Sequence, residues 1–146
     1  MVANYKSLYF EDIKIGHEVP ELTFPITFTR VVMGASAGRD WNPQHNDRDF
    51  VQKKMGLRDI FLPTSFYMGI LARYITDWAG PESFLSALEF RMQEPIFPGD
   101  TMRVTGKVSG TRTDDGRHLV DLDIRISTEK GPTTSASATV ELSSRS

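Results

Sequence analysis

Cysteine is absent from the 146-residue sequence. Its absence excludes disulfide bonds, thiol nucleophiles and zinc–thiolate centres. A strong charge of one sign is also lacking, since 17 Lys and Arg stand against 19 Asp and Glu for a formal net charge of −2. Nucleic-acid affinity rests on clustered positive charge, so this balance argues against a nucleic-acid-binding protein.

Long apolar runs are missing as well. No stretch approaches the roughly 18 apolar residues of a membrane span, and the N-terminal MVANYKSLYFEDIKIG lacks the unbroken apolar segment of a signal peptide. We therefore expect a soluble protein that does not enter membranes, and a cytoplasmic location is consistent with this. We found neither an internal repeat nor a low-complexity stretch, and the length suits one domain over residues 1–146 with its own core.

The first third of the chain predicts one strand and short helices. Within Glu21–Thr29, apolar residues at period two predict a half-buried strand, and Pro25 places it at a sheet edge. The small and apolar Val31–Gly38 predicts two helical turns, with Thr29 as a possible cap. After the loop Arg39–Asn46, we expect a short exposed helix over Asp47–Met55 that Gly56 terminates.

The rest of the chain predicts one long helix followed by strands. Ser65–Trp78 is nearly apolar at helical spacing, with Pro63 at its start and Gly80-Pro81 at its end. Turn-rich separators then divide four predicted strands: Phe84–Gln93, Thr101–Thr111, His118–Thr128 and Thr133–Leu142. One buried helix followed by an antiparallel meander is an α+β layout, and we expect the sheet to wrap around that helix.

Asp40 and His45 are the candidates for acid–base chemistry. Five residues apart, they would point about 140 degrees away from each other on a regular helix. Across a loop bent at Asn42-Pro43, both side chains can turn into one pocket, where a carboxylate activates a water and an imidazole moves a proton. Spacing alone favours a plainer interpretation, in which Asp40 is a turn or cap residue and His45 a partly exposed loop histidine.

The run Gly38–Asp47 (GRDWNPQHND) resembles the hydratase motif of (R)-specific enoyl-CoA hydratases and other MaoC-like proteins. Further likeness lies in Tyr9–Asp12, in the apolar helix and in Pro98-Gly99-Asp100, which recur in that family in the same order. Two other segments, Asp59–Phe61 and Arg73–Pro81, resemble the small MaoC-like subunits of heteromeric hydratases that act on steroid side-chain CoA thioesters in actinobacteria.

The resemblance implies a hot-dog fold, an antiparallel sheet wrapped around one long central helix. It implies a lyase in which Asp40 is the general base that activates water, while His45 orients that water and moves the proton to or from the α-carbon. The reaction would be reversible syn addition of water to a trans-2-enoyl-CoA, giving a (3R)-hydroxyacyl-CoA, with no cofactor beyond the CoA of the substrate. It also implies a homodimer, or a heterodimer or heterotetramer with another hot-dog subunit.

The start of the long helix departs from the family pattern. There the family stabilises the thioester enolate with backbone N–H groups, in the manner of an oxyanion hole. Where the usual motif has His-Gly, this chain has Leu62-Pro63-Thr64-Ser65, and Pro63 has no N–H to donate. The donor would be the amide of Thr64 or Ser65, with a hydroxyl as helper. Simple helix capping by these two residues explains them equally well.

Two other functions fit the same resemblance. A hot-dog acyl-CoA thioesterase often carries an acid on the central helix, whereas Thr64–Thr76 contains no carboxylate. A non-catalytic hot-dog subunit would leave the chemistry to its partner, but the intact Asp40–His45 motif favours a catalytic chain. The remaining histidines, His17 and His118, have no metal-ligand spacing and are expected at exposed loop or strand-end positions.

Overall fold

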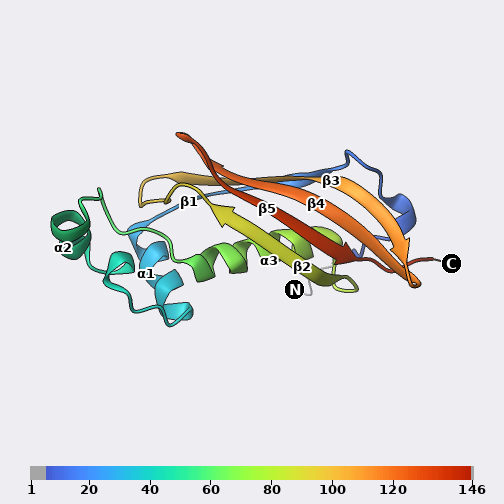
Figure 1. The fold of residues 1–146 in the computed structure, drawn as a ribbon, viewed down its shortest axis with the longest axis horizontal. Helices are drawn as coiled ribbons and strands as arrows, with labels where there is room; N and C mark the ends of the chain where they lie inside the picture. The colour runs from blue at the N-terminus through green and yellow to red at the C-terminus, as the bar shows by residue number, and fades with distance from the viewer. Residues whose placement is uncertain (1–5, 146) are drawn as a thin grey trace.

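A five-stranded antiparallel sheet wraps around one long helix in the computed structural model, which describes residues 6–145. The helix, α3, spans Thr64–Ala79 and lies along the inner face of the sheet (Figure 1). The strand order is β1-β3-β4-β5-β2, so β1 and β2 form the two edges. The strands are β1 (Glu18–Pro25), β2 (Phe84–Met92), β3 (Thr101–Asp114), β4 (Arg117–Thr128) and β5 (Gly131–Glu141). The expected α+β layout is confirmed.

Helix α3 supplies the centre of the core. The side chains of Tyr67, Leu71, Tyr74 and Ile75 are buried against the sheet, whereas Met68 on the outer side is 54% exposed. Gly80 ends the helix with φ +90°, and there a Cβ would lie 2.7 Å from the backbone oxygen of Lys6. The prediction of a helix over Ser65–Trp78 is therefore correct to within one residue at each end.

The sheet has one buried face and one exposed face. Along β4 the buried residues Val120, Leu122, Ile124 and Ile126 alternate with partly or fully exposed ones, which is the period-two pattern of such a sheet. Strands β3 and β4 are joined by Asp115-Gly116, both with positive φ, as a two-residue hairpin turn requires. The Asp-Gly pair thus sets the register of the longest hairpin.

The predicted strand Glu21–Thr29 is too long at its C-terminal end. Strand β1 stops at Pro25, and α1 spans Phe28–Ala37, so Phe28 begins a helix instead of continuing the period-two row. The cap is Thr27, not Thr29: its hydroxyl accepts a hydrogen bond from the Arg30 N–H at 3.1 Å. A side-chain oxygen that satisfies a free N–H of the first turn outweighs the strand pattern.

Short helical turns connect α1 to α3, beyond the N-terminal end of α3 (Figure 1). They are the 3-10 turn Pro43–His45, α2 (Arg48–Phe50) and a π-helical turn over Val51–Met55 that ends at the left-handed Gly56. The predicted helix over Asp47–Met55 and its glycine stop are confirmed. A further 3-10 turn, Phe10–Asp12, precedes β1.

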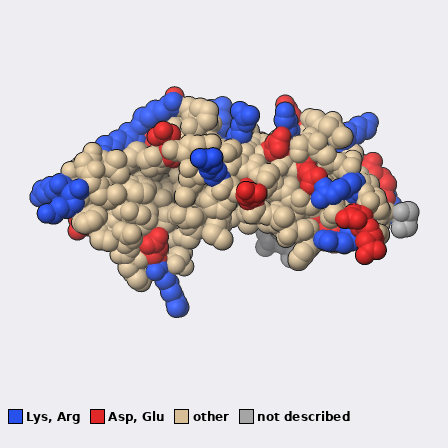
Figure 2. Space-filling model, viewed as in Figure 1, with Lys and Arg blue, Asp and Glu red and all other residues tan. Residues whose placement is uncertain are grey.

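Charge is unevenly spread over the face seen in Figure 2. Acidic and basic side chains gather together at the end where the C-terminus lies, while the surface around the start of α3 is mostly uncharged. Within residues 6–145, no helix combines the length and the apolar character needed to cross a membrane.

Candidate active site

The end of α1 holds the backbone of Asp40. Arg39 adopts the left-handed conformation, with φ +53°, and the N–H of Asp40 donates to the carbonyl oxygen of Ala35 at 2.9 Å. A left-handed residue followed by a hydrogen bond back across the last turn is a Schellman motif. The position of the Asp40 carboxylate therefore follows from the way α1 ends.

His45 is held by a backbone carbonyl on the opposite side of its ring from Asp40. The imidazole is only 3% exposed, and its Nδ1 lies 2.6 Å from the carbonyl oxygen of Phe61. Because a carbonyl can only accept a hydrogen bond, Nδ1 must carry a proton. In the neutral ring Nε2 is then the acceptor, and it lies 3.4 Å from Oδ2 of Asp40.

A second polar group reaches the same nitrogen. Nε2 of Gln44 lies 3.1 Å from Nε2 of His45, and an amide N–H there suits a ring nitrogen that accepts. The sequence places Gln44 beside His45 but gives no sign that the two side chains meet. The carbonyl of Phe61 could not be foreseen either, since backbone acceptors leave no mark on residue type.

The Asp40–His45 loop is fixed by its own polar residues. Oδ1 of Asp40 accepts from the Asn42 N–H at 3.2 Å, and the Asn46 amide donates to the Asn42 carbonyl at 3.1 Å. Pro43 begins the 3-10 turn that carries His45. The bend expected at Asn42-Pro43 brings Asp40 and His45 together, which the five-residue spacing on a regular helix would not do.

The two side chains differ in their access to water. His45 is buried, whereas the side chain of Asp40 is 37% exposed. A carboxylate open to solvent beside a buried imidazole can take a proton from a bound water, while the imidazole orients that water and relays the proton.

Thr64 and Ser65 begin α3 close to the same loop. Because these are the first two residues of the helix, their N–H groups have no intrahelical acceptor, and within residues 6–145 neither N–H forms a hydrogen bond. The Ser65 Oγ is buried and likewise has no hydrogen-bond partner within residues 6–145. A Cβ placed on Gly38 would come within 2.9 Å of the Ser65 Cβ, and closer still to Oγ. The start of α3 and the end of α1 therefore meet through a contact that only glycine permits.

A groove of about 390 Å³ runs between α1 and α3. Its walls are small or apolar apart from Ser65 and Arg73, and Gly38 joins it in sequence to Asp40. The lining residues are Gly34, Ala37, Gly38, Ser65, Phe66, Gly69, Ile70 and Arg73. Trp41 lies outside this lining and is 68% exposed, so it is not a packed residue within the isolated chain.

An ion pair supports the short helices near the site. Nε and Nη2 of Arg48 each lie 2.9 Å from a carboxylate oxygen of Asp59, which also accepts from the Ile60 N–H. Burial by itself would raise the pKa of Asp59, but these hydrogen bonds outweigh it and lower the pKa below its ordinary value. The pair ties α2 to the segment that leads to Phe61.

The other histidines lie away from this site in the chain. His17 is exposed just before β1, as expected. His118, the second residue of β4, is half-buried, with its ring 4.9 Å from the ring of Phe10 and Nδ1 3.3 Å from the Thr113 hydroxyl. Neither contact involves Asp40 or His45.

Comparisons with known proteins agree with one another. A family model described as a MaoC-like domain matches residues 13–130. The 3-oxo-4,17-pregnadiene-20-carboxyl-CoA hydratase beta subunit of Mycobacterium tuberculosis is 35% identical over 131 residues, covering 90% of this chain and 96% of that protein.

Solved structures show the same fold. A chain of the ChsH1-ChsH2 complex from Mycobacterium tuberculosis superposes with a TM-score of 0.81 at 29% identity, covering 88% of this chain and 98% of that one. The R-hydratase PhaJ1 from Pseudomonas aeruginosa gives 0.83 at 16% identity, covering 95% and 88% of the two chains. The (R)-hydratase of A. caviae involved in PHA biosynthesis gives 0.79 at 19%, covering 90% and 98%. These likenesses confirm the hot-dog fold, and with the family match over residues 13–130 they show that the chain belongs to the MaoC-like domain family.

Proposed function

We propose that this chain is the catalytic subunit of an enoyl-CoA hydratase, which adds water reversibly to a trans-2-enoyl-CoA and forms a (3R)-hydroxyacyl-CoA. The observation that carries the proposal is the approach of Asp40 Oδ2 to His45 Nε2 at 3.4 Å, with Nδ1 of the same ring on the Phe61 carbonyl. A chain that had lost catalysis would have no need to hold this histidine in one tautomer beside a half-exposed carboxylate.

The chemistry divides between the two residues. Asp40 accepts a proton from a water whose oxygen bonds to C3 of the enoyl group, while His45 Nε2 orients that water. The pair then returns a proton to C2, so that both residues regain their starting charge states and only water has been added.

The intermediate enolate oxygen needs hydrogen-bond donors. The free N–H groups of Thr64 and Ser65 at the positive end of α3, together with the buried Ser65 hydroxyl, are the donors that we assign to it. Pro63 cannot take part because it has no N–H. The acyl part of the substrate would occupy the groove between α1 and α3, whose walls are largely apolar.

A second hot-dog subunit belongs to the proposal. The relative in Mycobacterium tuberculosis is a beta subunit, and the ChsH1-ChsH2 structure is a complex. Met33, Trp41 and Met68 are each more than half exposed in the single chain, and a partner or a substrate would cover such apolar surface. The same heteromeric likeness supports the alternative of a non-catalytic subunit, so catalysis has to be tested directly.

The test follows the absorbance of enoyl-CoA thioesters with short, medium and steroid-like acyl groups. The purified chain is assayed alone and with candidate partner subunits, and released CoA is measured in parallel with a thiol reagent. We expect loss of the enoyl absorbance without release of thiol. Free thiol would identify a thioesterase instead, and no turnover under any of these conditions would refute the hydratase.

Matched variants assign the residues. Asp40→Asn and His45→Ala should each lower kcat by roughly 100- to 10,000-fold, the usual range for a positioned acid or base. Asp49→Asn is the control, because this exposed carboxylate pairs with Lys53 on the same short helical segment and the variant should keep full activity. Full activity in both site variants would reject the assignment while leaving the hydratase function intact.

A further inference from the structure

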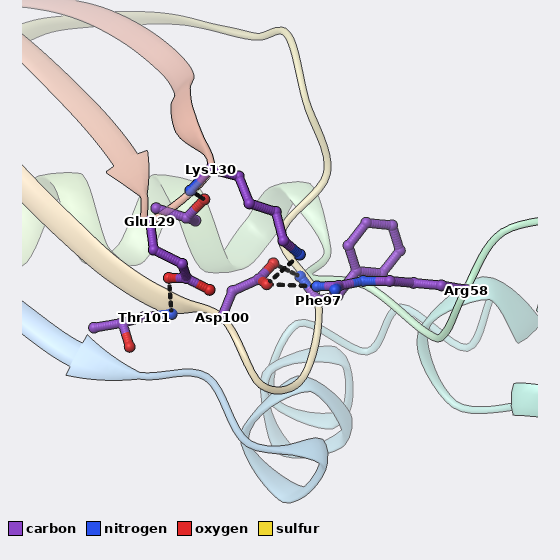
Figure 3. A network of polar contacts seen from close by, with 7 residues as sticks. Arg58, Phe97, Asp100, Thr101, Glu129 and Lys130 are labelled. Atoms are coloured by element: carbon purple, nitrogen blue, oxygen red, sulfur yellow. Dashed lines mark hydrogen bonds and ion pairs between the residues drawn. The ribbon is translucent and has the colours of Figure 1, made fainter.

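Asp100 is the only carboxylate buried within residues 6–145, with 3% of its surface exposed. It lies just before β3, in the turn formed by Pro98-Gly99-Asp100. Oδ2 accepts from the Phe97 N–H at 2.9 Å, while Arg58 and Lys130 both reach Oδ1, the lysine at 2.9 Å (Figure 3). Its two cations come from segments far apart in the chain, one before α3 and one in the β4–β5 turn.

Such an arrangement is energetically demanding. A buried charge is tolerated only when it is paired and hydrogen-bonded. Here burial alone would raise the pKa of Asp100, but the bonds from Phe97, Lys130 and Arg58 lower it below its ordinary value. The carboxylate is therefore ionised at neutral pH and joins three segments of the fold.

The contacts of this cluster lead to His45. The guanidinium of Arg58 stacks over the ring of Phe97 at 4.5 Å, and that ring meets the ring of Phe61 edge to face at 6.2 Å. The Phe61 ring in turn meets the imidazole of His45 at 5.2 Å, again edge to face. The same residue, Phe61, provides the carbonyl for His45 Nδ1.

The backbone reinforces this path. The N–H of Leu62 donates to the Ile96 carbonyl at 3.1 Å, and the N–H of Phe61 donates to the Gln44 carbonyl at 3.3 Å. Tyr67 of α3 is fully buried and forms a hydrogen bond with the backbone of Ile96, and burial raises the pKa of its hydroxyl. The segment 58–62 is thus held between the 96–100 turn and the loop that carries His45.

We propose that Asp100, through its ion pairs with Arg58 and Lys130, is a positioning residue for His45. By fixing the 58–62 segment against the 96–100 turn, it holds the Phe61 carbonyl where Nδ1 of His45 keeps its proton and Nε2 faces Asp40. This inference rests on the proposed function for its kinetic consequence, but its structural consequence can be measured without substrate.

The first measurement is of the His45 ring itself. In ¹⁵N NMR spectra recorded across a pH titration, the neutral form of the wild-type ring should show one protonated Nδ1 and one unprotonated Nε2. Asp100→Asn keeps an acceptor for the Phe97 N–H but leaves two cations without their anion, so the turn should shift. We expect the His45 signals to move toward a mixture of the two tautomers.

The second measurement is kinetic. A displaced Phe61 carbonyl should lower kcat by roughly 10- to 100-fold, as small misplacements of catalytic groups do, while KM changes little. Lys130→Arg retains the positive charge and should keep most of the wild-type kcat. Lys130→Met removes the charge and should lower kcat. Lys130 is 56% exposed, so Lys130→Met also tests the proposal if Asp100→Asn does not fold.

Controls separate positioning from general stability. Asp121→Asn removes a carboxylate that pairs with Arg112 and Thr139 on the sheet, and Ile124→Val opens a small cavity in β4. Both should lower the free energy of unfolding without changing the His45 signals or kcat. Unchanged His45 signals in a folded Asp100→Asn or Lys130→Met variant would overturn the proposal. Shifts of the His45 signals in the two control variants as large as those in Asp100→Asn would overturn it as well. Absence of hydratase activity in the wild type would leave the NMR result as its test.

Discussion

At the scale of single residues, Gly38 lies where a larger side chain would have no room. Its missing side chain lets Ser65 lie against the last turn of α1, two residues before Asp40. The sequence places Gly38 at the end of a predicted helix, and Gly38 is the C-cap of α1. That it also allows two helices to meet depends on a residue 27 positions further along the chain.

We predict that Gly38→Ala disrupts this contact. The added Cβ would lie within 2.9 Å of the Ser65 Cβ, so α1 and α3 must separate. Overpacking of this kind costs about 1–3 kcal/mol of unfolding free energy, and the Asp40 carboxylate would move with the end of α1. Urea denaturation and the hydratase assay should both register the change.

The second substitution Ser65→Gly provides the matched test of this contact. It removes the atoms that the new methyl group meets, so the double variant should recover most of the stability lost in Gly38→Ala. Additive losses would show that the two residues do not interact, since only coupled sites depart from additivity.

Predictability at the residue scale is uneven. The likeness of a ten-residue run to a family motif singles out Asp40 and His45, and the structure brings their side chains to within 3.4 Å. The contact of Gln44 with His45, the Phe61 carbonyl and the ion pairs of Asp100 are not predictable in this way, because they depend on side-chain directions and long-range contacts. A carbonyl acceptor and a buried turn carboxylate give no periodic signal in a sequence.

At the scale of secondary-structure elements, periodicity and turn residues predicted most of the fold. The long helix, the four C-terminal strands and their turns follow from spacing in the sequence. The end of β1 does not, because Ile26 and Phe28 continue its period-two row although Phe28 already belongs to α1. A cap at Thr27 and the buried position of Ile26 override that row, and both depend on tertiary context.

Tyr74 links two of these elements. Its hydroxyl donates to the Val19 carbonyl at 3.1 Å, at the irregularity where the register between β1 and β3 shifts. A Cβ on Gly106 of β3 would lie 3.2 Å from the Tyr74 ring, so the glycine leaves room for it. Helix α3 is therefore hydrogen-bonded to an edge strand as well as packed against the sheet.

We predict that Tyr74→Phe lowers the unfolding free energy by about 1 kcal/mol at neutral pH, because the Val19 carbonyl loses its donor. Burial raises the pKa of Tyr74 to about 12. The unfolded chain therefore loses this proton near pH 10, before the folded chain does, and stability should fall between pH 10 and 12. Urea denaturation over this range should show a smaller fall in the variant. An identical pH dependence in both proteins would contradict the assignment.

At the scale of the whole molecule, the sheet ends in a free edge at β2. Phe84 at the start of that strand is 64% exposed and Met92 at its end is 43% exposed. An unpaired edge strand bearing apolar side chains favours pairing with another chain. We therefore expect the second hot-dog subunit proposed above to pair with this chain along the β2 edge.

We predict that Phe84→Asp weakens this association. Light scattering and sedimentation should find the wild-type chain, alone or mixed with its partner subunit, at a mass above that of the monomer. The variant should dissociate with a Kd raised at least about tenfold, equivalent to about 1.4 kcal/mol. Ile15→Asp is the control, since Ile15 is 68% exposed but precedes β1 at the opposite edge. Dissociation by Ile15→Asp alone would place the interface elsewhere.

The difference in exposure between His45 and Asp40 limits how protons travel. Of the two side chains, only the carboxylate meets solvent, because the imidazole is enclosed and its far nitrogen is occupied by the Phe61 carbonyl. A proton removed from the α-carbon would thus reach bulk water by way of Asp40. When product release is slow, the protein in deuterated water should exchange hydrogen for deuterium at C2 of a bound thioester, because the proton reaches solvent through Asp40. Asp40→Asn should then abolish deuterium incorporation at C2 even where the thioester still binds.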